Sequence, residues 1–290
     1  MKKFLKNNKY NFKYKYPLKN ITTIKNNGYA KYIVYVQNYL EFEKLIKFLK
    51  KKKIKYLIIG NGSKLIFINN YKGVIISFKY LNKIEIKDYV EVEAGVNISS
   101  LIQKLKNNNL GGIEALIGIP SSIGGALINN ASAHNISLYD YLDKILVYND
   151  KLMFLDKKEI KYGYRFSSLK NKFIILKAYF KFDILDKKII DENILKYLNY
   201  RNEKQEISYP NIGSIFKNYE NIKAHKLIKE CHLENYKYKN VSFSRKHLNF
   251  LSINGKTNGK NIYKFIKIIQ KKVKKLTNID LETEIIFIKS

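Results

Sequence analysis

Two glycine-bearing loops are the first segments of this sequence that could bind a ligand. The first reads Gly60-Asn61-Gly62-Ser63, and the second is GIPSSIGGA at residues 118–126. Glycine has no Cβ, so such backbone can adopt positive φ, approach a ligand closely and present N–H groups to a phosphate. Each loop alone is more typical of a structural turn. Two of them about sixty positions apart could hold the two ends of an extended cofactor such as FAD.

Periodicity predicts the elements that would position the first loop. We expect strands at residues 31–36, 56–59 and 73–78, and a helix at 41–53 with Phe42, Leu45, Ile46 and Leu49 on its buried face. The loop follows the second of these strands directly. It lacks the dinucleotide fingerprint, because Leu65 stands at the sixth position instead of glycine, so a Rossmann site is not expected.

The rest of the chain divides into a middle region and a C-terminal segment. Alternation predicts a strand at residues 85–93, followed by a helix at 98–106, a long strand at 173–182 and a helical connector at 187–206. The C-terminal segment should contain a strand at 214–217, a helix from Ala224, strands near Val241 and Phe250, and a final strand at 284–288. Between them a long amphipathic helix should bury Ile262, Phe265, Ile266, Ile269, Val273 and Leu276.

The net charge of +31 invites a nucleic-acid interpretation, but the composition argues against it. Of the 55 basic residues only three are arginine, the residue that nucleic-acid sites favour for bidentate contacts, and lysine is spread from end to end. Abundant Lys, Asn, Ile, Tyr and Phe are typical of an AT-rich coding sequence. A polyanion-binding protein nevertheless remains the non-enzyme alternative, and it would show steeply salt-dependent affinity.

The sequence gives little sign of a membrane span, a secretion signal or a metal site. Apolar runs are too short to cross a bilayer, the lysine-rich start has no apolar core, and the single Cys231 excludes an intramolecular disulfide. We therefore expect a cytoplasmic protein without membrane contact. The histidines show no metal-ligand spacing, so no metal is expected.

Five motifs in order resemble one family. GNGSKLIF resembles that family's GGGSNLL, and GIPSSIGGALINNASA resembles GIPGTVGGAVVMNAGA; YGYRFSSLK, PNIGSIFKN and LETEIIFI resemble its GYRxSxFK, PNAGSxFKNP and LEPEVRxIG. The family is UDP-N-acetylenolpyruvoylglucosamine reductase, in its shorter subclass without an extra substrate-covering loop. The matching segments run from about Pro17 to Ile288.

This resemblance implies a reaction and three catalytic residues. Reduced FAD, regenerated by NADPH, would deliver a hydride to the enolpyruvyl double bond of a UDP-sugar, UDP-N-acetylglucosamine-enolpyruvate, giving UDP-N-acetylmuramate for peptidoglycan. Ser214 matches the general acid, and Arg165 and Glu284 match the residues that stabilise the enolic intermediate. Without the resemblance, Ser214 would be read as a turn cap, Arg165 as a surface cation and Glu284 as a solvent-facing carboxylate.

The resemblance also implies ligand contacts in both loops. For FAD these are Gly60, Asn61, Gly62, Ser63, Lys64, Leu65, Gly118, Ile119, Pro120, Ser122, Gly124, Gly125, Ala126, Asn130, Ala131, Ala133 and His134. For the UDP-sugar they are Lys217 and Asn218. The chain departs from the family pattern at Lys64, which replaces the usual Asn, at Ser121 and Ser132, which replace glycines, at Phe166, which replaces an acid, and at Thr283, which replaces proline.

The implied fold is α+β, with a two-lobed FAD-binding domain of the vanillyl-alcohol-oxidase/PCMH type and a C-terminal substrate-binding domain. We place the two lobes at residues 1–80 and 81–203 and the substrate domain at 204–290, in a monomer or weak dimer that binds no nucleic acid. An oxidase of the same flavin-binding fold is the alternative enzyme. It would share the loops without needing Ser214 or Glu284.

Overall fold

The computed structural model describes every residue except Ser208 and Ser290, and its chain forms two compact units. The first contains Met1–Lys13, Ile33–Asn61 and Ile75–Tyr200; the second contains Tyr14–Tyr32, Gly62–Val74 and Arg201–Ser290. The last boundary lies between Tyr200 and Arg201. The division into three parts at residues 80/81 and 203/204 stays a prediction.

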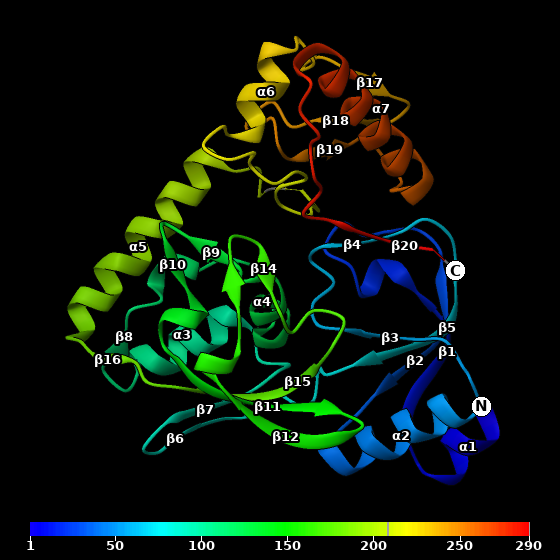
Figure 1. Cartoon of the computed structure of the whole chain (residues 1–290), viewed down its shortest axis with the longest axis vertical. Coiled ribbons are helices and arrows are strands. Elements are labelled where there is room, and N and C mark those ends of the chain that lie inside the picture. Colours follow the sequence, from blue (N-terminus) through cyan, green and yellow to red (C-terminus); the bar gives the residue numbers. More distant parts are fainter. Residues whose placement is uncertain (208, 290) are drawn as a thin grey trace. The chain divides into compact units, whose positions relative to one another are not determined.

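The N-terminal third is built on a four-stranded sheet of order β1-β2-β5-β3, formed by β1 (Asn11–Pro17), β2 (Tyr29–Tyr35), β5 (Tyr71–Ser77) and β3 (Tyr56–Ile59). Helices α1 (Lys2–Asn7) and α2 (Tyr39–Lys51) belong to the same region (Figure 1). The Asn38 side chain caps α2 by accepting a hydrogen bond from the Glu41 N–H at 2.9 Å. The four predicted apolar residues of α2 are fully buried, which confirms this helix.

A second sheet forms the middle of the first unit. It is antiparallel with the order β12-β11-β15-β7-β6, formed by β12 (Lys151–Asp156), β11 (Leu142–Asn149), β15 (Ile174–Phe180), β7 (Val90–Glu93) and β6 (Ile84–Ile86). Helices α3 (Ile98–Lys106) and α4 (Ile123–Asn129) follow β7 along the chain. The predicted elements at 98–106 and 173–182 are present with small differences in their ends. The single strand predicted at 85–93 is wrong, because the chain turns back after Ile86 and forms the antiparallel hairpin of β6 and β7.

Short paired strands and single turns of 3-10 helix complete the first unit. The pairs are β8 (Leu110–Gly111) with β16 (Asp183–Ile184), β9 (Ser132–Ala133) with β10 (Ile136–Ser137), and β13 (Tyr162–Gly163) with β14 (Phe166–Ser167). The turns are η2 (Glu114–Leu116), η3 (Leu138–Asp140) and η4 (Lys157–Glu159), and η1 (Leu18–Asn20) belongs to the second unit. The connector α5 (Lys187–Lys204) is helical as predicted.

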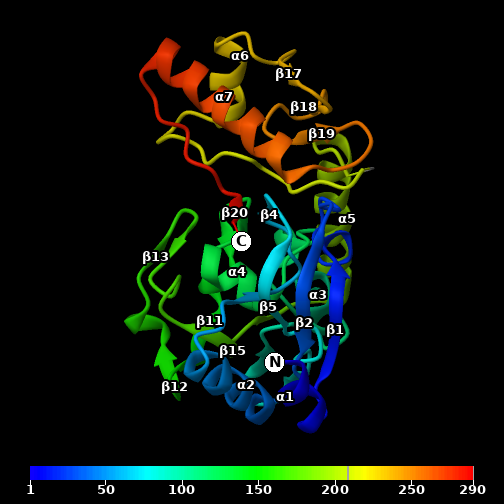
Figure 2. The ribbon, with the colours of Figure 1, turned by 90° about the vertical axis from the view of Figure 1, so that its right-hand side faces the viewer.

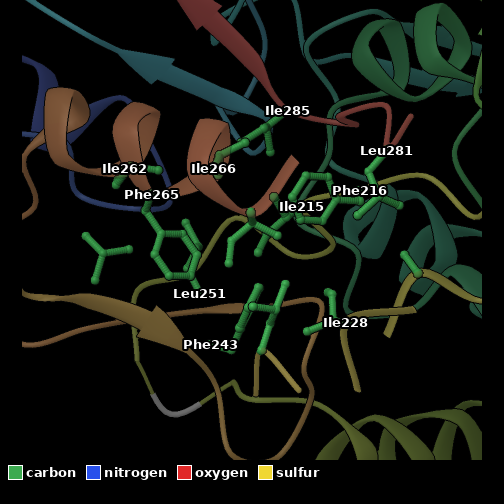
Figure 3. Packing of buried hydrophobic residues seen from close by; sticks show 14 of the residues in the cluster. Ile215, Phe216, Ile228, Phe243, Leu251, Ile262, Phe265, Ile266, Leu281 and Ile285 are labelled. Atoms are coloured by element: carbon green, nitrogen blue, oxygen red, sulfur yellow. The ribbon is translucent and has the colours of Figure 1, made fainter. Parts of the chain in front are cut away.

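The second unit joins distant segments around one apolar core. Strand β4 (Leu65–Phe67) pairs in parallel with β20 (Ile286–Ile288), and the two lie side by side in Figure 2. Strands β17 (Lys237–Tyr238), β18 (Val241–Phe243) and β19 (Leu251–Ile253) form a three-stranded sheet, accompanied by helices α6 (Ala224–Glu230) and α7 (Gly259–Thr277). Figure 3 shows Phe243 and Phe265 within this core.

Two predictions for the second unit were wrong. Leu276 is 63% exposed, because the apolar stripe of α7 extends one turn beyond the core and Val273 is its last buried residue. Residues 214–217 do not form a strand; they make only an isolated bridge between Phe216 and Thr283. The predicted α+β class holds, since the chain combines helices with sheets that are largely antiparallel where their pairing is described.

Candidate functional site

Ser214 lies in a loop that a buried asparagine holds in place. Asn249 is 4% exposed, its Oδ1 accepts from the Phe216 N–H at 2.9 Å, and its Nδ2 donates to the Phe216 carbonyl at 2.8 Å. The Asn249 carbonyl also accepts from the Ile215 N–H at 2.9 Å. Ile215 and Phe216 are fully buried in the core of Figure 3. The half-buried Ser214 is thus fixed by its neighbours, with Gly213 before it at a φ of 67°.

Glu284 is brought to this loop by the pairing of β20 with β4. Its N–H donates to the Ile215 carbonyl at 2.8 Å, and the N–H of Ile286 donates to the Lys64 carbonyl at 2.8 Å. The Glu284 side chain is only 5% exposed. This burial removes the alternative of a solvent-facing carboxylate and places Glu284 beside the Ser214 loop.

Lys64 connects these two groups through its side chain. Its Nζ lies 3.0 Å from Oε2 of Glu284 and donates to the carbonyl of Ser214 at 2.8 Å. Sequence patterns gave Lys64 only as an FAD contact, which stays a prediction, and they did not indicate this ion pair. The partners are 220 residues apart in the chain (64 to 284), so no local pattern could signal it.

The two proposed substrate contacts sit on the same loop. The Lys217 Nζ lies 2.8 Å from Oε2 of the exposed Glu282, and the Lys217 N–H donates to the Glu282 carbonyl at 2.8 Å. The Asn218 Oδ1 accepts from the Ala224 N–H at 3.1 Å at the start of α6. Both side chains therefore have structural partners, and their contacts with substrate stay predictions.

Arg165 belongs to the first unit, at the turn between β13 and β14. It adopts a φ of 53°, which is uncommon for a residue with a Cβ. Its guanidinium donates from Nη1 to Ser132 Oγ at 2.9 Å and lies 5.1 Å from the centre of the Tyr164 ring. Phe166, which stands where the family has an acid, is 52% exposed. A meeting of Arg165 with Ser214 and Glu284 stays a prediction.

Within the first unit, the two glycine loops touch. A Cβ on Gly60 would lie 2.0 Å from Ser122 Oγ, so only glycine permits this approach. Ser122 caps α4 by accepting from the Gly125 N–H at 3.3 Å. The N–H of Gly124 donates to the Ala94 carbonyl at 2.9 Å, which ties the second loop to the segment after β7.

The residue after α4, just beyond the second loop, carries an acceptor that the described residues leave unused. Asn130 is 8% exposed, has a φ of 42°, and donates from Nδ2 to the Gly163 carbonyl at 2.8 Å. Its buried Oδ1 accepts no hydrogen bond from any described residue. Buried acceptors are normally satisfied, so this atom suits a ligand with an N–H donor.

His134, another predicted FAD contact, lies against α5. The centre of its ring is 4.9 Å from the ring centre of Tyr197 and 4.8 Å from that of Tyr200.

The remaining predicted cofactor contacts differ in exposure. Gly118, with a φ of 76°, and Pro120 are exposed, whereas Ile119 is half-buried. The Asn61 side chain bonds to the Asn97 side chain, and Ala131 donates its N–H to the Ala126 carbonyl at 2.9 Å. The N–H groups of Gly62 and Ser63 make no hydrogen bond to another residue in the described part of the chain. Such N–H groups suit a phosphate, and the roles of all these residues stay predictions.

The described residues contain no group of three or more His, Cys, Asp or Glu side chains placed to hold a metal ion. No helix among them is long and apolar enough to cross a membrane.

Comparison with known protein families assigns both parts of the chain. Residues 30–151 match the model described as an FAD-binding domain, and residues 205–288 match the C-terminal domain of UDP-N-acetylenolpyruvoylglucosamine reductase. The fold and the matched domains thus define a two-part flavoprotein oxidoreductase. The fold also resembles the crystal structure of UDP-N-acetylenolpyruvylglucosamine reductase from Thermus caldophilus, with a TM-score of 0.81, 23% identity, and coverage of 97% of this chain and 99% of that one.

Curated relatives specify the family. The UDP-N-acetylenolpyruvoylglucosamine reductase of Clostridium tetani is 36% identical over 276 residues, covering 93% of this chain and 90% of its own. That of Carboxydothermus hydrogenoformans is 35% identical over 275 residues, covering 93% and 91%. The chain belongs to the UDP-N-acetylenolpyruvoylglucosamine reductase family. The resemblance inferred from five motifs is confirmed, and the protein is an FAD-dependent oxidoreductase.

Proposed function

We propose that this protein reduces the enolpyruvyl double bond of UDP-N-acetylglucosamine-enolpyruvate to give UDP-N-acetylmuramate for peptidoglycan, with NADPH as the reductant. The observation that carries the proposal is the pairing of the Ser214 loop with a buried Glu284, through the Ile215 carbonyl and the Lys64 side chain. A turn cap and a solvent-facing carboxylate would need no such pairing. The alternative oxidase would not need it either.

The glycine loops fit FAD by the chemistry of their groups. The cofactor supplies hydride chemistry when it is bound. The N–H groups of Gly62 and Ser63 would face a phosphate, and the unused Oδ1 of Asn130 would accept from an N–H of the cofactor. Gly60 and Gly124 have no side chain where the second loop packs closely, Gly60 against Ser122 and Gly124 against Ala94.

Residues of the chain itself would then donate the proton and stabilise the negative charge that develops on the substrate. The reduction adds a hydride to the terminal carbon of the enolpyruvyl group and a proton to the adjacent carbon, so negative charge develops at that carbon and its carboxylate. The Ser214 hydroxyl donates the proton, which a weak acid can do only when held within hydrogen-bond reach of a strongly basic carbon. Arg165 offers two parallel donors to the carboxylate, and Arg165 and Glu284 together stabilise the enolic intermediate.

A two-step anaerobic experiment tests this function. NADPH should bleach the flavin absorption of purified protein, and the enolpyruvyl UDP-sugar should restore it. In the variant Ser214→Ala, bleaching should proceed at the parent rate, whereas recovery should slow by roughly 100-fold or more because the proton donor is missing. Recovery within tenfold of the parent rate would contradict the role of Ser214. Oxygen consumption driven by a small alcohol or sugar without NADPH would favour the oxidase instead.

A further inference from the structure

The Lys64 ammonium stands inside the group of residues to which we assign the proton transfer. It lies 3.0 Å from Oε2 of Glu284 and 2.8 Å from the Ser214 carbonyl, and a Cβ on Gly213 would lie 3.4 Å from it. Its side chain is 27% exposed, against 5% for Glu284. A mobile lysine side chain on the protein surface would seldom contact a carboxylate and a backbone carbonyl at the same time.

The backbone around Lys64 fixes this position. Its carbonyl accepts from the Ile286 N–H at 2.8 Å, as part of the parallel pairing of β4 with β20. The Ile215 carbonyl accepts from the Glu284 N–H at 2.8 Å. Three distant segments, around residues 64, 214 and 284, are thus joined by backbone as well as by the ammonium. The position of Nζ follows from the fold and not from chance contact.

Charge explains why a cation is useful at this point. A buried carboxylate is costly unless it is paired, and an unpaired one would oppose negative charge developing on the substrate. The Lys64 ammonium offsets the charge of Glu284 and adds positive potential beside Ser214. Its bond to the Ser214 carbonyl also restricts the backbone that carries the hydroxyl.

We propose that Lys64 is a positioning residue for the substrate half of the reaction, acting through Glu284 and Ser214 rather than as a contact of FAD. This inference rests on the proposed function of those two residues. Asn stands at this position in the motif that the chain resembles, and Asn could donate a hydrogen bond but could not offset a charge. Substitutions of Lys64 can therefore show whether its positive charge or its hydrogen-bond donor is needed.

The variants Lys64→Met, Lys64→Gln and Lys64→Arg separate these roles. Lys64→Met should lower kcat for the enolpyruvyl UDP-sugar by at least about tenfold with KM nearly unchanged, because the ammonium acts on developing charge. Lys64→Gln keeps a donor and should lose about as much, and it replaces Lys64→Met if that variant does not fold. Lys64→Arg keeps the charge and should recover most of kcat. Flavin content and the rate of bleaching by NADPH should equal the parent values in all three.

The matched control is Lys274→Met, because Lys274 pairs with the exposed Asp280 at 2.8 Å in the same unit. It should leave both half-reactions at the parent rate. In addition, Lys64→Met combined with Glu284→Gln should lose clearly less than the product of the two single losses, since part of the effect of Lys64 passes through that carboxylate.

Three outcomes would overturn the inference. The first is a kcat of Lys64→Met within threefold of the parent, and the second is loss of bound flavin, which would make Lys64 a cofactor contact. The third is a fully multiplicative loss in the double variant. If Ser214→Ala and Glu284→Gln also leave flavin recovery intact, the proposed function itself fails; if those two abolish it and Lys64→Met does not, only this inference fails.

Discussion

The two units position their candidate residues in different ways. In the second, Ser214, Glu284 and Lys64 come from segments up to 220 residues apart, and strand pairing and the Asn249 bridge fix their backbone. In the first, Arg165 sits on a tight turn between two-residue strands and reaches its partner Ser132 through its side chain. The ion pair of a buried carboxylate thus needs long-range backbone support, whereas a guanidinium on a turn depends on local conformation and side-chain contacts.

The largest effect should come from adding a side-chain atom where two backbone segments of the second unit pack against each other. A Cβ on Gly259, at the start of α7, would lie 1.9 Å from the Phe67 carbonyl oxygen at the end of β4, and backbone cannot move away cheaply. Gly259→Ala should lower the free energy of unfolding by about 3 kcal/mol or more, measured by denaturant titration. The control is Gly163→Ala beside the Arg165 turn, where a Cβ meets nothing within 4 Å and the change should stay within about 0.5 kcal/mol. If both variants lost the same free energy of unfolding, the contrast between the two units would be wrong.

A smaller effect is expected from changing the guanidinium of the first unit. Arg165→Lys keeps the charge but loses the two parallel donors, so flavin recovery with the enolpyruvyl UDP-sugar should slow by about 100-fold, or about 2.7 kcal/mol. Stopped-flow absorbance measures this rate. Arg245→Lys, at an exposed position, is the matched control and should match the parent. If both substitutions behave alike, Arg165 has no special role.

The smallest effect concerns pH and two histidines of the second unit. Burial, with Lys223 and Lys226 nearby, lowers the pKa of His225, and burial with the neighbouring His225 lowers the pKa of His247. The folded state thus disfavours their protonated forms, and stability present above about pH 6.5 is lost as the pH falls through the lowered values. Denaturant titrations at about pH 7.5 and about pH 5.5 should show this loss, reduced in His225→Gln. An unchanged loss in that variant would contradict it.

Local pattern predicted the helices better than the site. The 3.6-residue period located α2 and α7 because each buries a continuous apolar stripe, but it did not show where the core ends, and so it misplaced Leu276. The stretch 214–217, with Ile215 and Phe216 at its centre, was predicted as a strand. It is instead a loop whose N–H groups bond to Asn249, a residue that no nearby pattern singles out.

The sequence by itself determined the family, because five short motifs in a fixed order are recognisable in a chain otherwise rich in lysine and asparagine. It also named Ser214 and Glu284, since motif positions carry over residue by residue. Only the tertiary structure decided that Glu284 is buried and that Lys64 is its partner. The physical reason is that burial and ion pairing depend on which segments the fold brings together, and the parallel pairing of β4 with β20 is invisible to any local window.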